Sequence, residues 1–335
     1  MVFVKLPEPP GDGTTALRFA PDGSSLLASS WDSILRLYGA APSACALRAT
    51  LPQPSPLLDC DFVDARTVAS GGLDGAVRLS PLDGAGGERV LGEHAGAARC
   101  VRRCDAVGAL VTAGWDATLK LWDVRAADAC VGTYAQPGKV HALCVGAGAA
   151  APPRVVVAAA GRRVDVLDLR MPDEPPLRFE SGLRTQARCV AQMASGDGFV
   201  LGAVDGRVAI EYFDPSEASQ SRKFAFKAHH EAGAGGKPAV AHPVNAVAFH
   251  PVHGTFATGG CDGRVNVWDG AAKKRVFQYE KLPTSVAALA FSPNGDTLAI
   301  AASYTYEHGE RSHPPDALHL HAVADAEVRP KPRAK

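Results

Sequence analysis

Four residues in the first half of the chain have the types that could carry out proton transfer: His94, Thr112, Asp116 and Trp122. A histidine beside a carboxylate and a hydroxyl group is a familiar acid–base arrangement. The same set could instead be a structural hydrogen-bonded network between strands. It recurs only in fragments along the chain, and no Ser or Cys nucleophile elbow accompanies it. We therefore interpret the set as structural and expect no enzymatic activity.

A second group of residues has the chemistry to bind a peptide. Trp31 and Trp115 each directly precede an aspartate, and large aromatic side chains are frequent anchors of protein interfaces. Arg188, Arg207 and Lys227 could pair with carboxylates or phosphates, and the arginine fork matches the geometry of both. Each cation alone could equally be a solvated surface charge. The three cations can act in one binding surface only if the fold places them on the same side of the molecule.

The chain repeats one pattern, namely an apolar strand, a turn of small residues that usually contains aspartate, and an alternating strand. Asp32, Asp74 and Asp116 lie in three of these turns and are 42 residues apart. This spacing fits the period of about 40–45 residues that is typical of β-propeller blades. Aspartate followed by a small residue joins two strands tightly. The copies are LLASSWDSILRLYG (26–39), TVASGGLDGAVRLSPL (67–82), LVTAGWDATLKLWDV (110–124), VVVAAAGRRVDVLDL (155–169), FVLGAVDGRVAIEYF (199–213), TFATGGCDGRVNVWDG (255–270) and, interrupted by an insertion, TLAIAASYTYE with ALHLHAV (297–323).

Four short strands in each of seven units predict an all-β fold, a seven-bladed WD40 β-propeller. The four residues described first have the spacing of the network that holds WD blades together. The last unit lacks a fourth strand, and we expect FVKL (3–6) to complete it, which closes the ring and removes sheet edges. We expect one propeller domain over 1–325 and a basic C-terminal tail over 326–335. The Ala-, Gly- and His-rich segment 228–241 is predicted to be an inserted loop.

Propeller topology places the candidate binding residues on one rim. The turn between the second and third strands lies on the same rim as the link from the fourth strand to the next blade. The five residues predicted there are Trp31, Trp115, Arg188, Arg207 and Lys227. Such a rim suits a phosphorylated or acidic peptide. Trp122 and Trp268 end third strands and are expected in the core.

Composition excludes several classes of function. Lys plus Arg and Asp plus Glu both number 35, so the net charge is zero and nucleic-acid binding is disfavoured. The eight cysteines form no CxxC pair, no secretory segment follows Met1, and no apolar run reaches the roughly 18 residues of a membrane helix. We expect a soluble, intracellular protein with free thiols. The histidines at 229, 230, 242, 308 and 313 match no metal-ligand spacing, so we expect no metal and no cofactor.

Several segments resemble a known family over nearly the whole chain. SSWDSILRLY, AGWDATLKLWD, AGRRVDVLDLR, DGRVAIEYFDPS, VNAVAFHPVHGTFATGGCDGRVNVWD and SYTYE are similar to the spindle-checkpoint WD-repeat proteins of the budding-uninhibited-by-benzimidazoles family. The resemblance runs from about Val4 to DAEVRPKP (325–332). The segment after Lys227 and the stretch 146–153 depart from the family pattern.

The resemblance implies a mitotic adaptor. In the family, rim tryptophans and an arginine bind a short acidic motif of the checkpoint kinases, and the matching positions are Trp31, Trp115 and Arg188. A basic pair reads a phosphothreonine in the kinetochore scaffold, and Arg207 and Lys227 match it. The ubiquitin-ligase mitotic checkpoint complex is a further implied partner. The implied location is the nucleus and, in mitosis, the kinetochore, with the cytoplasm as an additional site.

Two other functions remain open at this point. The sister family, the mRNA-export WD proteins of the nuclear pore, shares the GRVAI turn and the FxFKxH strand, and its members bind a nucleoporin motif. The short N-terminal segment and EYFDPS favour the checkpoint family. The third possible function is that of an enzyme built on a propeller, but the sequence offers no paired carboxylates and no group of metal ligands directed at the central channel.

Overall fold

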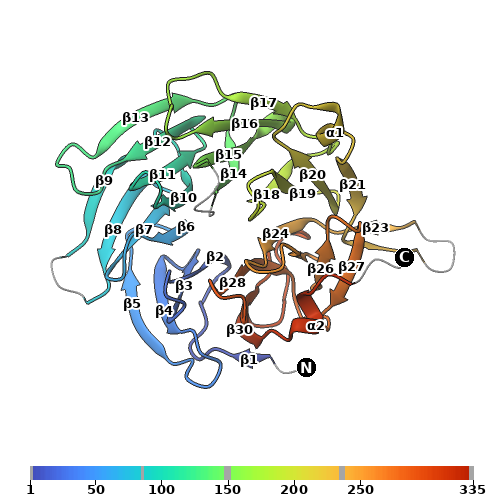
Figure 1. Ribbon diagram of the computed structural model, residues 1–335. Helices are drawn as coiled ribbons and strands as arrows, with labels where there is room; N and C mark the ends of the chain where they lie inside the picture. Colours follow the sequence, from blue (N-terminus) through green and yellow to red (C-terminus); the bar gives the residue numbers. More distant parts are fainter. Residues whose placement is uncertain (1–2, 84–86, 147–151, 234–237, 332–335) are drawn as a thin grey trace.

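Seven four-stranded antiparallel sheets are arranged around a central axis in the structure of this protein, a computed structural model that describes residues 3–83, 87–146, 152–233 and 238–331 (Figure 1). Each sheet is one blade, and the first strand of each blade lies innermost. The predicted seven-bladed β-propeller is confirmed. No helix among the described residues is long and apolar enough to cross a membrane.

The blades follow the chain in order. The first three are β2 (Thr14–Phe19), β3 (Ser25–Ser30), β4 (Ile34–Gly39) and β5 (Leu47–Pro52); β6 (Leu57–Phe62), β7 (Thr67–Gly72), β8 (Ala76–Pro81) and β9 (Arg89–Glu93); and β10 (Ala98–Cys104), β11 (Ala109–Gly114), β12 (Thr118–Trp122) and β13 (Cys130–Ala135). The next three are β14 (Val140–Val145), β15 (Arg154–Ala159), β16 (Arg163–Asp168) and β17 (Leu177–Glu180); β18 (Ala187–Gln192), β19 (Gly198–Ala203), β20 (Arg207–Tyr212) and β21 (Phe224–Lys227); and β24 (Val244–Phe249), β25 (Phe256–Gly260), β26 (Val265–Asp269) and β27 (Lys274–Gln278). The seventh joins β28 (Val286–Phe291), β29 (Thr297–Ala302) and β30 (Ala317–Ala322) to β1 (Val4–Lys5).

Burial explains the sequence patterns of the strands. The second strand of a blade packs against neighbours on both faces, so β3, β19 and β29 are buried at every position. The outermost strand faces solvent on one side, and β5 alternates between half-buried and exposed residues. An apolar strand therefore precedes each turn, and an alternating strand ends each unit.

The hydrophobic core is divided among the joints between blades. The described residues form seven separate clusters of buried side chains, and each cluster draws its residues from two neighbouring blades. Phe199 and Leu201, for example, pack with residues of β15 and β16. Each blade thus depends on both of its neighbours for burial of its two faces.

The N-terminal strand closes the ring, as predicted from the orphan segment FVKL. Val4 pairs with Leu320 and Lys5 with His319, so β1 is antiparallel to β30 (Figure 1). The Leu6 amide donates to the Leu318 carbonyl over 2.8 Å, and the Leu6 side chain is buried.

Short elements lie outside the blades. They are the 3-10 turn η1 (Ala160–Arg162), α1 (Glu217–Gln220), α2 (Asp325–Val328) and the hairpin of β22 (His230–Glu231) and β23 (Val240–Ala241). The hairpin gives the predicted inserted loop 228–241 paired ends. Val328 of α2 is buried in the cluster between the sixth and seventh blades, so α2 packs on the propeller.

Candidate functional site

The set that opened the sequence analysis is a hydrogen-bonded network inside the third blade. His94 contacts Asp116 through Nδ1 at 3.1 Å and Thr112 through Nε2 at 2.8 Å. The Trp122 indole N–H donates to the same Thr112 hydroxyl over 2.8 Å. Trp122 and His94 are buried, and the prediction that Trp122 belongs to the core is confirmed.

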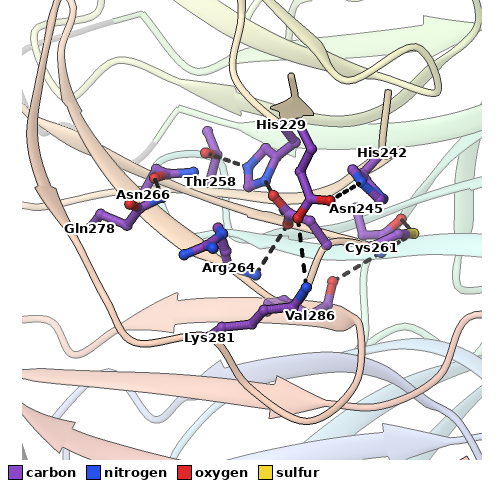
Figure 2. A network of polar contacts seen from close by, with 12 residues as sticks. His229, His242, Asn245, Thr258, Cys261, Arg264, Asn266, Gln278, Lys281 and Val286 are labelled. Carbon is purple, nitrogen blue, oxygen red and sulfur yellow. Dashed lines mark hydrogen bonds and ion pairs between the residues drawn. The ribbon is translucent and has the colours of Figure 1, made fainter. Parts of the chain in front are cut away.

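A second complete network, which the sequence analysis missed, joins the segment after β21 to the sixth blade, and Figure 2 shows its His229 and Thr258. His229 contacts Asp262 through Nδ1 at 2.9 Å and Thr258 through Nε2 at 2.8 Å. The Trp268 indole donates to the Thr258 hydroxyl over 2.9 Å. Trp268 is only half-buried, in contrast to the core position expected for it, because its outer face lines a surface groove with Phe226 and Lys273.

Hydrogen bonding assigns a structural role to these networks. Each threonine hydroxyl accepts a hydrogen bond from a tryptophan N–H and donates its own proton to histidine Nε2. Because Nε2 is then an acceptor, the histidine proton is on Nδ1, which donates to the aspartate. Burial lowers the pKa of His94, although Asp116 opposes the shift. Burial would raise the pKa of Asp116, but hydrogen bonds from Thr118 and the interaction with His94 bring it below its usual value. In the third-blade network a neutral His94 joined to an ionised Asp116 holds two strands and the adjoining loop together.

Three of the five predicted site residues line one pocket at the mouth of the central channel. Trp31, Trp115 and Arg188 border a cavity of about 560 Å³. The side chain of Trp31 is 40% exposed, and Trp115 is half-buried. We call this cavity, whose lining also includes Arg99 and Tyr304, the channel-mouth pocket.

The turns position the two tryptophans. The Trp31 amide donates to the Gly13 carbonyl and the Trp115 amide to the Ala97 carbonyl, each over 3.0 Å. The aspartate after Trp115 accepts the Ala95 amide over 3.0 Å. Since the backbone is held from both sides, the indole at the tip of the turn projects toward the channel mouth instead of folding into a blade.

Two tyrosines that the sequence analysis did not single out complete the aromatic lining. Tyr304 and Tyr306 lie two and four residues after the end of β29, in the loop that follows the second strand as the turn of Trp31 follows β3, and their ring centroids are 5.5 Å apart. Tyr306 is 62% exposed. An aromatic residue in the turn or loop that follows the second strand is the feature that these positions share with Trp31 and Trp115.

Arg188 supplies the pocket with a charge that is not neutralised locally. It makes no ion pair or side-chain hydrogen bond with any residue that the structure describes. Asp12 is the one carboxylate among the described residues of the pocket lining, and it is exposed. The pocket is therefore aromatic on its walls and cationic toward the channel.

Arg207 and Lys227 form a separate basic pair in the fifth blade. They are directly opposite each other in the pairing of β20 with β21. Lys227 is exposed, and Arg207 lies 3.9 Å from the Asp205 carboxylate. Like charges directly opposite each other destabilise a sheet. The pair is suited to an anionic ligand that would remove this repulsion.

The second network positions the basic pair. Lys227 is followed by Ala228 and His229, and the amides of these two residues donate to the Gly206 carbonyl over 2.9 and 3.0 Å. Gly206 has φ +74°, and a Cβ there would lie 2.5 Å from the His229 carbonyl oxygen, so a side chain is excluded. The buried His229 thus fixes the end of β21 against the turn that presents Arg207.

The fourth blade offers a comparison at the corresponding positions. There the first residue of the third strand, Arg163, is opposite Glu180. Arg162 in the preceding turn forms an ion pair with the same glutamate. The two rim cations at 162 and 163 share one acid on the outer strand, whereas in the fifth blade the outer-strand residue opposite Arg207 is a cation and the nearby acid, Asp205, lies in the turn.

No group of three or more His, Cys, Asp or Glu side chains within the described ranges is arranged to hold a metal ion. His230 and His242 lie on the β22–β23 hairpin instead, where Glu231 contacts His242 and Lys281 at 3.6 Å each (Figure 2). His229 belongs to the structural network. The eight cysteines are free thiols.

Residues 6–39, 88–123 and 238–269 match the family model described as WD domain, G-beta repeat. With its seven four-stranded blades and two hydrogen-bonded His–Thr–Asp–Trp networks, the chain is a WD-repeat β-propeller. It is 45% identical to the mitotic checkpoint protein BUB3.1 of Arabidopsis thaliana, over 98% of this chain and 95% of that protein. It is 36% identical to the mitotic checkpoint protein bub3 of Dictyostelium discoideum, over 97% and 96%. The chain belongs to the BUB3 family of mitotic checkpoint proteins, which confirms the resemblance seen in the sequence.

The sister family is also represented among the relatives. The Poly(A)+ RNA export protein of Schizosaccharomyces pombe is 33% identical over 98% of this chain and 93% of its own length. The checkpoint relatives are more similar, so the export reading is the weaker fit. These relatives are named as checkpoint or export proteins, which fits a WD-repeat protein that acts through protein–protein contacts in the mitotic checkpoint.

Proposed function

We propose that this protein is a non-enzymatic adaptor of the spindle assembly checkpoint that binds two different peptide motifs on one rim. A short acidic motif of checkpoint kinases occupies the channel-mouth pocket, where Trp31, Trp115 and Arg188 contact it. A phosphothreonine motif of the kinetochore scaffold binds at Arg207 and Lys227. The protein acts in the nucleus, at the kinetochore in mitosis, with the cytoplasm and the ubiquitin-ligase mitotic checkpoint complex as further settings.

The unneutralised arginine in an aromatic pocket is the observation that carries the proposal. An acidic side chain would pair with Arg188 at the channel side of the pocket. Apolar neighbours in the motif would pack on the indole rings of Trp31 and Trp115, which are among the side chains that most often dominate peptide affinity.

The basic pair explains how phosphorylation would control the second contact. Phosphothreonine carries about −1.5 to −2 charges at neutral pH. It would relieve the repulsion between Arg207 and Lys227 and accept hydrogen bonds from both. An unphosphorylated threonine carries no charge to relieve the repulsion and offers only a neutral hydroxyl as acceptor, so docking on the scaffold would follow the activity of a mitotic kinase.

Titration calorimetry with two peptides tests the first contact. A peptide with the acidic motif of a checkpoint kinase should bind, and a nucleoporin-derived motif should bind more weakly. Arg188→Glu should reduce affinity for the kinase peptide by at least about 10-fold without a fall in Tm of more than about 2 °C. Arg66→Glu is the matched control, because Arg66 is exposed in the turn between β6 and β7 on the opposite rim and forms no ion pair with any described residue. Binding of the nucleoporin peptide alone would contradict the checkpoint assignment.

A second titration tests the phosphate contact. The wild-type protein should bind a phosphothreonine scaffold peptide and fail to bind the unphosphorylated form. The double variant Arg207→Ala, Lys227→Ala should lose the phosphopeptide and keep the kinase motif. Equal affinity of the wild-type protein for both forms of the peptide would refute phosphate reading.

A further inference from the structure

The joint between the third and fourth blades opens into a cavity of about 660 Å³ that neither of the proposed peptide contacts uses. We call it the joint pocket. The third blade contributes Ala135, Gln136 and Pro137, and the fourth blade contributes residues of β16 and β17, among them Asp165 and Arg178. The joint pocket shares no described residue with the channel-mouth pocket, so the two cavities can hold separate ligands.

Two buried polar side chains enter the joint pocket from opposite walls. Side chains two residues apart along a strand share one face. Asp165 therefore faces the third blade, like Leu167, which packs in the hydrophobic cluster between the two blades. Gln136 follows β13 on the same face as Tyr134, which packs on that cluster from the third blade. Asp165 is 2% exposed and Gln136 is 9% exposed.

Each of these two side chains has an acceptor oxygen without a hydrogen-bond partner among the described residues. The atoms are Asp165 Oδ2 and Gln136 Oε1. The orientation of the Gln136 amide is set by Nε2, which donates to the Tyr134 and Ala135 carbonyls over 3.2 and 3.3 Å. Its oxygen therefore points away from those carbonyls. Buried acceptors are normally paired, so two unpaired acceptors at one pocket indicate a ligand that donates hydrogen bonds.

The unpaired carboxylate arises from a reversal of charge in the fourth blade. In the first blade the third residue of the third strand is Arg36, which forms an ion pair with Asp32 of its own turn. The second blade repeats this arrangement. In the fourth blade the same strand position is occupied by Asp165, and the turn supplies Arg162. Arg162 pairs with Glu180 of the outer strand instead of Asp165, so the reversed pair does not form.

Arg178 compensates Asp165 only in part. The two residues are directly opposite each other in the pairing of β16 with β17. Arg178 Nε lies 3.7 Å from Asp165 Oδ2, too far for a hydrogen bond, and 75% of the Arg178 side chain is exposed. Burial raises the pKa of Asp165, although Arg178 and Arg163 oppose the shift. The carboxylate would be stabilised by a cation that approaches it more closely than Arg178 does.

We propose that the joint pocket binds an arginine side chain of a partner protein, held by Asp165 and Gln136. A guanidinium group has five donors and no acceptor, so it can supply both unpaired oxygens at once. Its fork matches the geometry of a carboxylate. The aliphatic stem would lie along Ala135 and Pro137. A lysine ammonium group would reach Asp165 but lacks the planar fork.

An NMR titration of the ¹⁵N-labelled full-length protein tests this site with three capped tripeptides. The probes are acetyl-Gly-Arg-Gly-amide, its lysine analogue, and its citrulline analogue, which keeps the shape of arginine and loses the charge. The arginine peptide should shift the side-chain amide signal of Gln136. The citrulline peptide should bind at least roughly 10-fold more weakly, the usual effect of losing a charge-assisted hydrogen bond. Equal affinity for the arginine and citrulline peptides would refute a cation site, and an unshifted Gln136 signal would refute its location.

Variants assign the contacts. Asp165→Asn should weaken binding of the arginine peptide at least about 10-fold and leave Tm unchanged or higher, because the Oδ2 atom that loses its charge has no hydrogen-bond partner among the described residues. Gln136→Met should weaken binding roughly 3- to 10-fold. Arg178→Gln should strengthen it, since this change removes the competing cation. Asp105→Asn is the control, because Asp105 is an exposed carboxylate on the opposite rim.

Two results would overturn the proposal. If Asp165→Asn and Arg178→Gln both melted more than about 3 °C below wild type, while peptide affinity stayed within about twofold, Asp165 and Arg178 would form a structural ion pair. If the acidic kinase peptide competed with the arginine peptide, the latter would be bound at Asp12 in the channel-mouth pocket. We expect both peptides to bind together, and failure of the joint pocket would leave the proposed checkpoint contacts untouched.

Discussion

The basic pair of the fifth blade predicts that one substitution will stabilise the protein and abolish its phosphopeptide binding. Lys227→Glu places a carboxylate opposite Arg207, as Glu180 is opposite Arg163 in the fourth blade. A cross-strand pair of opposite charge contributes about 0.2–1 kcal/mol, and like charges are destabilising. Because Lys227 is exposed, solvent screens the change, and we expect a gain of at most about 1 kcal/mol, or about 1–3 °C in Tm.

The same substitution should remove the phosphopeptide. A hydrogen bond to a charged group contributes about 1.5–3 kcal/mol, which corresponds to roughly 10- to 150-fold in affinity. The new carboxylate also repels the phosphate, so the total loss should exceed about 100-fold. Calorimetric titration gives the affinity, and differential scanning calorimetry gives the Tm. The acidic kinase motif should bind as before, since Lys227 does not line the channel-mouth pocket.

Glu180→Lys is the matched reciprocal variant. It creates two facing cations in the fourth blade and removes the partner of Arg162. We expect a lower Tm and unchanged phosphopeptide affinity. If Lys227→Glu bound the phosphopeptide within about threefold of wild type, or melted more than about 3 °C below it, the role given to the pair would be wrong.

Three further predictions concern the framework around the site. Thr258→Val removes the hydroxyl shared by His229 and Trp268 and should lower the free energy of unfolding by about 2–4 kcal/mol in chemical denaturation, with weaker phosphopeptide binding. Burial holds the pKa of His94 below its ordinary value of 6.5, so its neutral form stabilises the fold above about pH 6.5. Tm should therefore fall as the pH drops below this value, and a Tm that rises between pH 6.5 and 5 would contradict the assignment. Deletion of residues 1–6 leaves β30 as an open sheet edge and should lower Tm and promote aggregation, measured by light scattering.

The blades and their turns could be predicted from sequence because each repeat carries its own signals. An apolar strand, an aspartate turn and an alternating strand recur with a nearly fixed period. Because Trp31 and Trp115 each directly precede the aspartate of a turn, the repeat also predicted their position at the tips of the turns. Closure by the N-terminal strand was also predictable. The last repeat had only three strands, and the segment FVKL (3–6) belonged to no repeat.

The second hydrogen-bonded network could not be read from spacing. His94 and Asp116 are 22 residues apart, whereas His229 and Asp262 are 33 residues apart because the hairpin insertion separates them. Tyr304 was hidden for a related reason, since the seventh blade has a long loop where five of the other six blades have an aspartate turn.

The β-bulges of the inner strands, each of which leaves one residue such as Arg99 without a Cα partner in the second strand, were invisible for a different reason. A one-residue shift of strand pairing leaves no mark in hydrophobic alternation, and a residue such as Arg99 then resembles any polar residue of an inner strand. Its place at the channel mouth emerges only from the observed register of all seven blades.

The pairing of β1 with β30 has a consequence for the way this protein is made. Val4 and Leu320 are partners, so the first strand to leave the ribosome must wait for the last strand of the propeller. At about 5–20 residues per second, this interval is roughly 15–60 s. During that time the nascent chain carries unpaired strand edges, and its terminal inter-blade clusters lack one of their two sides. Completion of the ring, rather than formation of any single blade, is therefore the step at which the nascent protein becomes protected from misassociation.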